Sequence, residues 1–408
     1  MISKDIKNNF PIFKKVSNLV YLDSAATSQT PEGVLKAMEE YYTGFRSNIH
    51  RGLYRMGEQA TESYEGARRK IARFIGADEG EIVFTSGATD SSNMLIRSIE
   101  ESLELREGDE IVTTVMEHHS TLIPLQKLAK RRKLVLKHIS MTSDFHLDYR
   151  EAEKLITPKT KIVSVILASN VLGTINDIKT IANLAHEVGA LMVVDGTEAV
   201  GHISVDVKEF DADFLYFSGH KMLGPTGIGV LYGKKELLYK VEPSIFGGGI
   251  VEKVTLTDAT WKRAPARFEA GTQNIAGAIG LGAAVEYLEE IGIQNIHKHV
   301  QELTEDAIKK LEKINGVKIF TQKNTKKNVG IVSFIIEGIH SHDIAEIAGR
   351  DDVAIRAGHH CAQPLIETLG VRATARASFY MYNSKNDIDR LVISIDRAHT
   401  MFLKTTID

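Results

Sequence analysis

Cys361 stands in a setting that suits a reactive side chain. It is the only cysteine among 408 residues, so it cannot form an intrachain disulfide or, alone, a cysteine-based zinc site. The residues before it read Arg-Ala-Gly-His-His, a polar segment unlike the core strands in which free cysteines are commonly buried. A cysteine attacks as the thiolate, and the neighbouring Arg and His charges are expected to favour that form. We therefore interpret Cys361 as a nucleophile.

Lys221 is the second candidate for chemistry. It ends the segment Ser218-Gly219-His220-Lys221, which follows the apolar run Phe-Leu-Tyr-Phe. A lysine shielded from water acts more readily as an amine nucleophile toward carbonyl groups. Because most lysines lie on the surface, a plain loop lysine is the other interpretation of this residue.

Three more segments place polar residues where apolar runs end. Residues 85–93 contain a glycine turn before a helical pattern, which suits either a phosphate, with Thr89 adding a hydroxyl, or a plain helix cap. His118 and His119 are adjacent and point to opposite sides, so they favour a ring-stacking or loop role over a metal site. Asp195 follows two valines and suits either a proton on a ring nitrogen or a turn.

These segments fit one cofactor when they are taken together. In open α/β sheets, ligands bind outside the carboxyl ends of the strands, so all four segments are expected at one edge. A phosphate site, a lysine amine and an acidic partner for a pyridinium nitrogen are what pyridoxal 5'-phosphate requires. No G-x-G-x-x-G follows a first strand and no P-loop is present, so a nicotinamide or nucleotide cofactor fits less well.

Alternating short apolar runs and amphipathic stretches predict an α/β fold with a mostly parallel sheet. The expected strands are 81–84, 110–113, 133–137, 162–167, 191–194, 214–217 and 228–232, the last one reversed at the sheet edge. Helices are expected over 61–75 and 178–188, and over 280–314 with a break near Gly292. We expect a large domain over 20–285 and a smaller α/β domain formed by 1–19 and 286–408, which carries the Cys361 loop.

Composition excludes several classes of protein. The net charge is -3, with 50 basic and 53 acidic residues, which argues against nucleic acid or an anionic membrane as a partner. No apolar run is long enough to span a membrane. The first residues are mixed and charged, without the apolar core of a signal peptide, so a cytoplasmic location is expected.

The chain resembles the cysteine desulfurases, which are class V, fold-type I pyridoxal phosphate enzymes. The resemblance runs from about residue 20 to about residue 400 and is closest to the type II, Suf-type group, which includes selenocysteine lyases. It rests on Tyr21-Leu-Asp-Ser-Ala-Ala-Thr27, Glu117-His-His119, Ala168-Ser-Asn-Val-Leu-Gly173, Val194-Asp-Gly196, Ser218-Gly-His-Lys221, Arg267-Phe-Glu-Ala-Gly-Thr272 and Arg356-Ala-Gly-His-His-Cys361.

The resemblance implies a role for each matched residue. Lys221 would form the Schiff base and move the substrate's α-proton, Asp195 would pair with the pyridinium nitrogen, and His118 would stack on the ring. The residues implied for the phosphate are Ala88, Thr89, Ser218, His220 and, from the neighbouring subunit, Thr272. The residues implied for the substrate are Asn170, Arg356 and Arg376. Asn170 and Glu198 are also implied for the cofactor, and His118 is implied to be catalytic together with Lys221 and Cys361.

The resemblance also implies the reaction and the partners. Cys361 would take sulfur from L-cysteine as a persulfide, releasing L-alanine, and would pass it to an acceptor protein of the Suf system for iron–sulfur cluster assembly. Thr272 implies a homodimer with shared sites. The other interpretations are a selenocysteine lyase acting on L-selenocysteine, another class V activity such as an aminotransferase or C–S lyase, and a non-catalytic scaffold. A positioned thiol at Cys361 favours the desulfurase.

Glu198 departs from the family pattern. The family places a glutamine there, whose amide donates a hydrogen bond to the cofactor's phenolic oxygen. An ionised carboxylate cannot donate and would repel a phenolate. Three outcomes are open: Glu198 is protonated, its side chain turns away, or the activity is altered.

Overall fold

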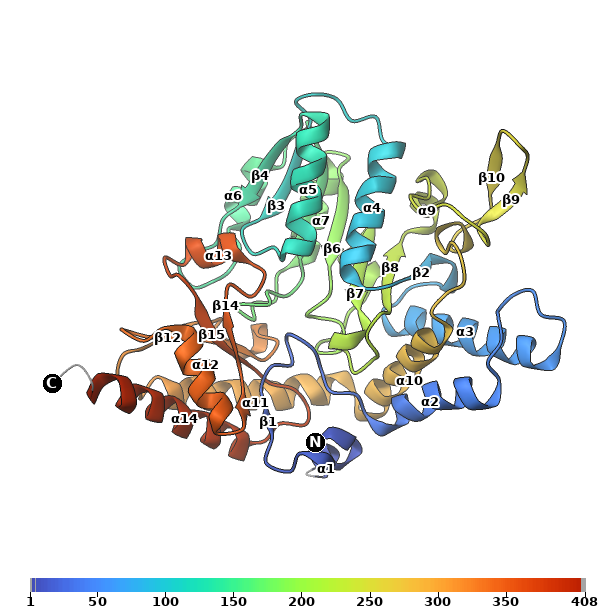
Figure 1. Cartoon of the computed structure of the whole chain (residues 1–408). Coiled ribbons are helices and arrows are strands. Elements are labelled where there is room, and N and C mark those ends of the chain that lie inside the picture. Colours follow the sequence, from blue (N-terminus) through green and yellow to red (C-terminus); the bar gives the residue numbers. More distant parts are fainter. Residues whose placement is uncertain (1, 4, 405–408) are drawn as a thin grey trace.

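The computed structural model describes residues 2–3 and 5–404, and these form a seven-stranded sheet beside a smaller one (Figure 1). The large sheet has the order β2-β8-β7-β6-β5-β3-β4. Its strands are β2 (Ile82–Thr85), β3 (Glu110–Thr114), β4 (Val135–Ile139), β5 (Thr160–Ile166), β6 (Leu191–Asp195), β7 (Phe214–Ser218) and β8 (Gly229–Gly233). The expected mostly parallel sheet is confirmed, since β8 is the one reversed strand among the described strands of the large sheet.

The expectation for β8 was half wrong. It is reversed as expected, but it lies between β7 and β2, so the edge strands are β2 and β4. Every residue of β8 is buried. A short apolar run of this kind fits a central strand as well as a protected edge, and periodicity does not separate the two.

Helices cover both faces of the large sheet. Val193 and Val194 are successive on β6 and belong to separate hydrophobic clusters, because successive side chains of a strand point to opposite faces. In Figure 1, α4 (Ala88–Ser102) and α5 (His119–Arg132) cover the front, and α7 (Ile178–Glu187) packs on β5 and β6 behind. The other helices of this region are α2 (Glu32–Gly44), α3 (Arg55–Phe74), α6 (Tyr149–Leu155), α8 (Val207–Phe210), α9 (Lys235–Lys240) and α10 (Ile275–Ile291).

The smaller sheet is antiparallel, in the order β11-β12-β15-β14. Its strands are β11 (Val317–Phe320), β12 (Ile331–Ile336), β14 (Arg356–Gly358) and β15 (Thr374–Ser378), and its helices are α11 (Ile293–Leu311), α12 (Ser341–Arg350), α13 (Gln363–Thr368) and α14 (Lys385–Lys404). The predicted helix break is confirmed at Gly292, whose φ of +85° ends α10 before α11 begins. None of the described helices is long and apolar enough to cross a membrane.

The N-terminal segment packs against the C-terminal part of the chain. Short helix α1 (Pro11–Lys15) follows Phe10, whose ring lies 5.0 Å from that of Tyr382. Strand β1 (Val20–Tyr21) then pairs with β13 (Val353–Ala354). The division into 20–285 and 1–19 with 286–408 stays a prediction, and its residues 1, 4 and 405–408 lie outside the described residues.

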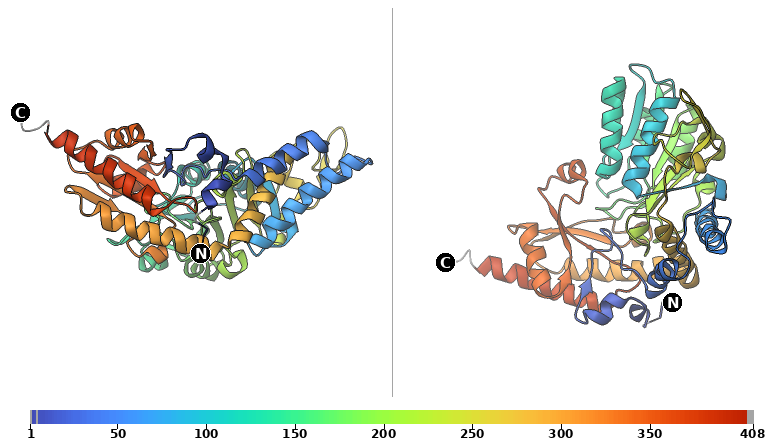
Figure 2. Two further views of the ribbon diagram at one scale, coloured as in Figure 1. Left: turned by 90° about the horizontal axis from the view of Figure 1, so that it is seen from below. Right: turned by 45° about the vertical axis from the view of Figure 1, so that its right-hand side comes forward.

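Residues 22–28 connect the smaller sheet to the loop after β7. At one end the Ala25 N–H donates to Ser378 Oγ at 2.9 Å. At the other end the Ser28 N–H donates to the His220 carbonyl at 2.8 Å. The arrangement brings residues of both parts of the chain around one cavity. A hairpin of β9 (Val251–Val254) and β10 (Ala259–Trp261) lies at the end of the molecule opposite the C-terminal helix (Figure 2, left).

Candidate active site

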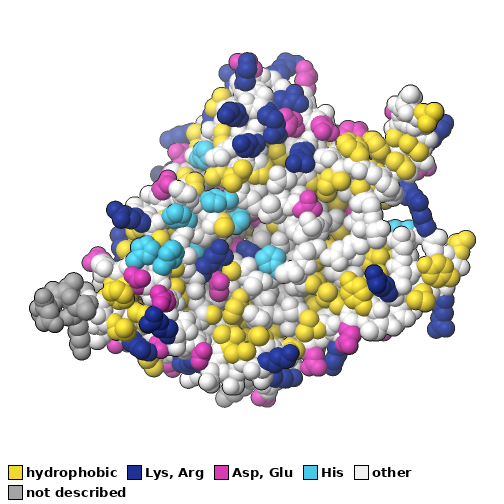
Figure 3. Space-filling view, viewed as in Figure 1, with side chains coloured by type: hydrophobic (Ala, Val, Ile, Leu, Met, Phe, Trp, Pro, Cys, Tyr) yellow, Lys and Arg dark blue, Asp and Glu magenta, His cyan; other side chains and the backbone are white. Residues whose placement is uncertain are grey.

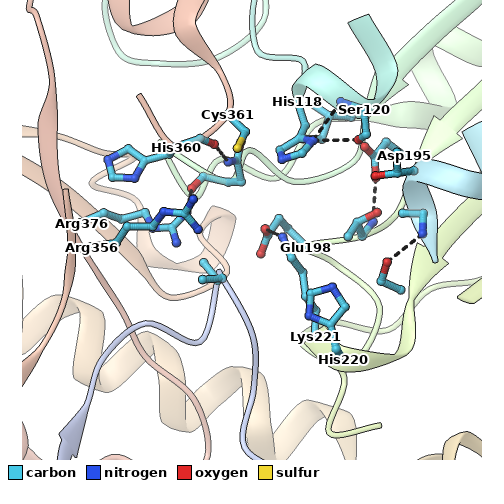
Figure 4. Close-up of a pocket in the computed structure, with 18 residues that line it drawn as sticks. His118, Ser120, Asp195, Glu198, His220, Lys221, Arg356, His360, Cys361 and Arg376 are labelled. Carbon is cyan, nitrogen blue, oxygen red and sulfur yellow. Dashed lines mark hydrogen bonds and ion pairs between the residues drawn. The ribbon is translucent and has the colours of Figure 1, made fainter. Parts of the chain in front are cut away.

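A cavity of about 170 Å³ lies where β5, β6 and β7 end, and the smaller sheet closes its other side. All of the site residues predicted from the sequence line it, apart from Thr272. They are Ala88, Thr89, His118, Asn170, Asp195, Glu198, Ser218, His220, Lys221, Arg356, Cys361 and Arg376. Figure 4 shows most of them pointing inward from opposite sides.

One end of the cavity is built for an anion. Helix α4 begins there, and its N-cap, Gly87, has no side chain to cap the first-turn N–H groups. Ser218 Oγ accepts from the Ala88 N–H at 2.8 Å, which places a hydroxyl beside that turn. Burial, and then the charge of Lys221, lowers the pKa of His220 to about 4, so its ring is neutral at pH 7. Free backbone N–H groups, hydroxyls and a ring N–H suit a phosphate.

Asp195 is fixed as a hydrogen-bond acceptor at the cavity floor. It is 1% exposed, with Oδ2 accepting from Thr121 Oγ1 and Oδ1 from the Thr197 N–H, both at 3.0 Å. The Thr121 hydroxyl also lies 2.7 Å from the Tyr216 hydroxyl. A held carboxylate of this kind suits a protonated ring nitrogen. The sequence analysis missed Thr121 and Tyr216, since nothing in their local sequence separates them from other helix and strand residues.

His118 presents a neutral ring to the cavity. It caps α5, and its Nδ1 accepts from the Ser120 N–H at 3.1 Å. Burial, and then the charge of Lys221, lowers its pKa to about 3. Because Nδ1 is an acceptor, the neutral ring carries its proton on Nε2. Ser120 is a second residue that the sequence analysis did not single out.

Glu198 and Lys221 form a buried ion pair between Oε1 and Nζ. The Glu198 side chain is 3% exposed and that of Lys221 is 11% exposed. Of the three outcomes expected for Glu198, a side chain turned away is wrong. The lysine amine therefore meets a carboxylate at the centre of the cavity (Figure 4).

Arg376 is held on two sides by other residues. Its Nη1 donates to the Asn170 carbonyl at 2.8 Å and its Nη2 to Asp23 Oδ1 at 2.9 Å. Its Nε is buried and has no hydrogen-bond partner among the described residues. A guanidinium that is fixed in this way and keeps free N–H capacity suits a carboxylate ligand.

Cys361 lies across the cavity from Lys221, on the loop after β14 (Figure 4). The expected charge from neighbouring histidines is partly wrong. Burial, and then the charge of Arg376, lowers the pKa of His360 to about 2, so that ring is neutral at pH 7. Arg356 lines the same cavity and keeps its charge, because a guanidinium is not deprotonated in proteins.

Thr272 is exposed and lies outside this cavity. It lines a separate surface hollow with His50, Arg51 and Lys262. Its predicted contact with a phosphate is therefore not made within a single chain.

The donor set around the cavity fits pyridoxal phosphate. An anion cradle at α4, a carboxylate at Asp195 and the amine of Lys221 surround one space, as that cofactor requires. Within residues 2–3 and 5–404, no group of three His, Cys, Asp or Glu side chains is placed to hold a metal ion.

Comparisons with known proteins agree with this geometry. The aminotransferase class-V family model matches residues 20–391. A probable cysteine desulfurase of Halalkalibacterium halodurans is 49% identical over 406 residues, covering 98% of this chain and 99% of that protein. A probable cysteine desulfurase of Staphylococcus epidermidis is 49% identical over 403 residues, covering 98% and 97%.

Two solved structures are similar over almost the whole chain. The apo cysteine desulfurase of Thermococcus onnurineus superposes with a TM-score of 0.93 at 40% identity, covering 97% of this chain and 98% of that one. The cysteine desulfurase CsdA (S-sulfonic acid) of Escherichia coli gives 0.92 at 37% identity, covering 98% and 100%.

Proposed function

Because the chain belongs to the class V aminotransferase family and, within it, to the cysteine desulfurases, we propose that it converts L-cysteine to L-alanine and holds the sulfur as a persulfide on Cys361. The observation that carries the proposal is that Cys361 and Lys221 line one cavity from opposite sides. A transaminase or a simple C–S lyase has no use for a thiol in that place.

The cofactor of this family is pyridoxal phosphate, which supplies an electron sink for negative charge at the substrate's α-carbon. In the proposed site Ala88, Thr89, Ser218 and His220 would hold its phosphate. Asp195 would accept from its pyridinium nitrogen, and the neutral ring of His118 would lie against its ring.

The substrate would be held and converted by residues on both sides of the cavity. Arg376 takes the carboxylate with its free N–H capacity, and Asn170 and Arg356 lie beside it. The Lys221 amine removes the proton from the α-carbon. The Cys361 thiolate would then bond to the substrate's sulfur as the bond between that sulfur and the β-carbon breaks. One proton goes to the β-carbon and the removed proton returns to the α-carbon, which leaves alanine and a persulfide.

The experiment that tests this proposal is alanine formation from L-cysteine by the wild type and by Cys361→Ala, with and without a thiol reductant. We expect the variant to retain the visible absorption of bound pyridoxal phosphate and to form alanine at about 1% of the wild-type rate or less. Mass spectrometry should find an added sulfur atom on Cys361 of the wild type alone. Alanine formation by Cys361→Ala at the wild-type rate would overturn the persulfide mechanism.

We also propose that two copies of the chain share their sites. Support comes from Thr272, which is exposed and outside the cavity, and from apolar side chains that gather at the same end of the molecule (Figure 3). The exposed apolar residues there include Leu53, Tyr54, Phe246, Val254 and Leu256. Sedimentation should give a dimer, and Thr272→Ala should weaken pyridoxal phosphate binding about tenfold. A monomer with full activity would exclude shared sites.

The destination of the sulfur is the last part of the proposal. We propose an acceptor protein of the Suf system that takes the persulfide sulfur for iron–sulfur cluster assembly in the cytoplasm. The single free thiol suits a reducing compartment. Transfer of labelled sulfur from Cys361 to a purified acceptor is the measurement that decides it.

A further inference from the structure

The loop that carries Cys361 accepts hydrogen bonds from two residues that follow strands of the large sheet, Asn170 after β5 and His119 after β3. Asn170, 3% exposed in the segment after β5, donates from Nδ2 to the carbonyl oxygen of His360 at 2.6 Å. The backbone N–H of His119, at the start of α5, donates to the carbonyl oxygen of Cys361 at 2.8 Å. Two successive carbonyls of the loop are thus fixed from across the cleft.

The gripped residues have a backbone conformation that needs outside support. His360 and Cys361 have φ of +52° and +58°, in the left-handed region that residues with a side chain rarely adopt. Two such residues in succession persist only where surrounding contacts hold them. The His360 ring provides one more contact, since its Nε2 lies 2.9 Å from Thr374 Oγ1.

The bond to His360 also fixes which way the Asn170 amide points. Only Nδ2 can donate to a carbonyl, so Oδ1 must occupy the other position. Oδ1 is buried and has no hydrogen-bond partner among the described residues. Within the described residues, the hydrogen bond to the Cys361 loop is what orients the carboxamide, and the same bond holds the loop.

We propose that Asn170 is the positioning residue for Cys361: its amide holds the loop in the strained turn that keeps the thiol facing Lys221. The role in sulfur transfer rests on the proposed desulfurase function. The hydrogen bond from Asn170 to the His360 carbonyl does not depend on that function.

Backbone hydrogen exchange on the full-length, cofactor-loaded chain tests whether Asn170 holds the Cys361 loop. The probes are the N–H groups of Ala362 and Gln363, which donate to the His359 carbonyl and to His119 Nε2 within this turn. Loss of one buried hydrogen bond worth about 1.4 kcal/mol corresponds to a factor of ten. Asn170→Ala should therefore exchange about tenfold faster at both positions than the wild type.

Asn176→Ala is the matched control. Asn176 is also a buried asparagine after β5, its Nδ2 donates to a carbonyl, that of Ile166, at 2.8 Å, and its Oδ1 likewise has no partner among the described residues. Its hydrogen bonds do not reach the Cys361 loop. It should leave exchange at Ala362 and Gln363 unchanged.

The same samples allow a second measurement. Because Cys361 is the only cysteine, the rate of alkylation by iodoacetamide in the cofactor-free chain reports this thiol alone and should rise in Asn170→Ala. If Asn170→Ala does not fold, Asn170→Asp keeps the volume and removes the donor. Exchange at the wild-type rate in the Asn170 variants, or equally fast exchange in Asn176→Ala, would overturn the proposal. Neither measurement requires turnover, so each can fail while alanine forms normally.

Discussion

The carboxylate of Glu198 pairs with the amine of Lys221, and both side chains are buried in the cavity. A charged pair shielded from water is held together strongly once it is formed. Removing one partner leaves the other charge buried without compensation, which is more costly than losing both charges.

Glu198→Gln should therefore lower the free energy of unfolding of the cofactor-free chain by about 3 kcal/mol. The double variant Glu198→Gln with Lys221→Met should recover much of that loss, because no buried charge remains. Urea denaturation of the wild type, Glu198→Gln, Lys221→Met and the double variant gives the coupling energy between the two side chains. Simply additive losses would show that the two side chains do not interact.

Glu117→Gln should change how stability depends on pH. Burial, and then the charge of Asp195, raises the pKa of Glu117 to about 8 from 4.5. Between these values the unfolded chain has lost a proton that the folded chain keeps, so stability falls as pH rises through this window. Without the carboxyl, the slope of unfolding free energy against pH should become more positive by up to about 1.4 kcal/mol per unit. Urea denaturation at pH 5, 6 and 7 measures it, and identical slopes would contradict a protonated Glu117.

His202→Phe should act on the acid side. The ring of His202 lies 4.2 Å from that of Tyr380, and burial, then the charge of Lys221, lowers its pKa to about 3 from 6.5. Between these values the unfolded chain binds a proton that the folded chain excludes, so stability falls as pH is lowered. As the pH is lowered below 6, the free energy of unfolding of the variant should fall by about 1.4 kcal/mol less per pH unit than that of the wild type. Denaturation at pH 6, 5 and 4 checks this, and parallel curves would count against a neutral His202.

Arg376→Lys should weaken substrate binding more than turnover. A lysine keeps the charge but not the fork that meets a carboxylate. Loss of a charged hydrogen bond worth about 1.5–3 kcal/mol predicts a KM for L-cysteine about 10- to 100-fold higher. Arg372→Lys, at an exposed position nearby, is the control and should leave KM unchanged. An unaltered KM in Arg376→Lys would remove Arg376 from the substrate site.

Sequence patterns predicted the features of this fold that depend on neighbouring residues in the chain. The strand ends at Thr89, Asp195 and Lys221 could be brought to one edge because parallel strands end together. The break at Gly292 was visible because glycine readily adopts a positive φ at a helix end. The position of β8 inside the sheet depends on pairing between distant segments, which no local pattern encodes.

The contacts that hold the site together could not be predicted from the sequence, because they also join residues far apart in the chain. Thr121 binds Asp195 from 74 residues away, and Asn170 binds the His360 carbonyl from 190 residues away. No motif or characteristic spacing in the sequence indicates either contact. The neutral state of His360 also depends on burial, which the fold creates and the motif Arg-Ala-Gly-His-His-Cys does not reveal.

The segment 22–28 has a consequence for synthesis on the ribosome. It joins the loop of Lys221 to Ser378, while Asp23 holds Arg376. The strands of the large sheet are complete by Gly233, so that part of the chain can emerge and pair well before the cavity is closed. A nascent chain that stops short of Arg376 would have the lysine and the phosphate cradle but neither the thiol loop in place nor the arginine for its substrate. Such a chain would lack the residues for the proposed sulfur transfer.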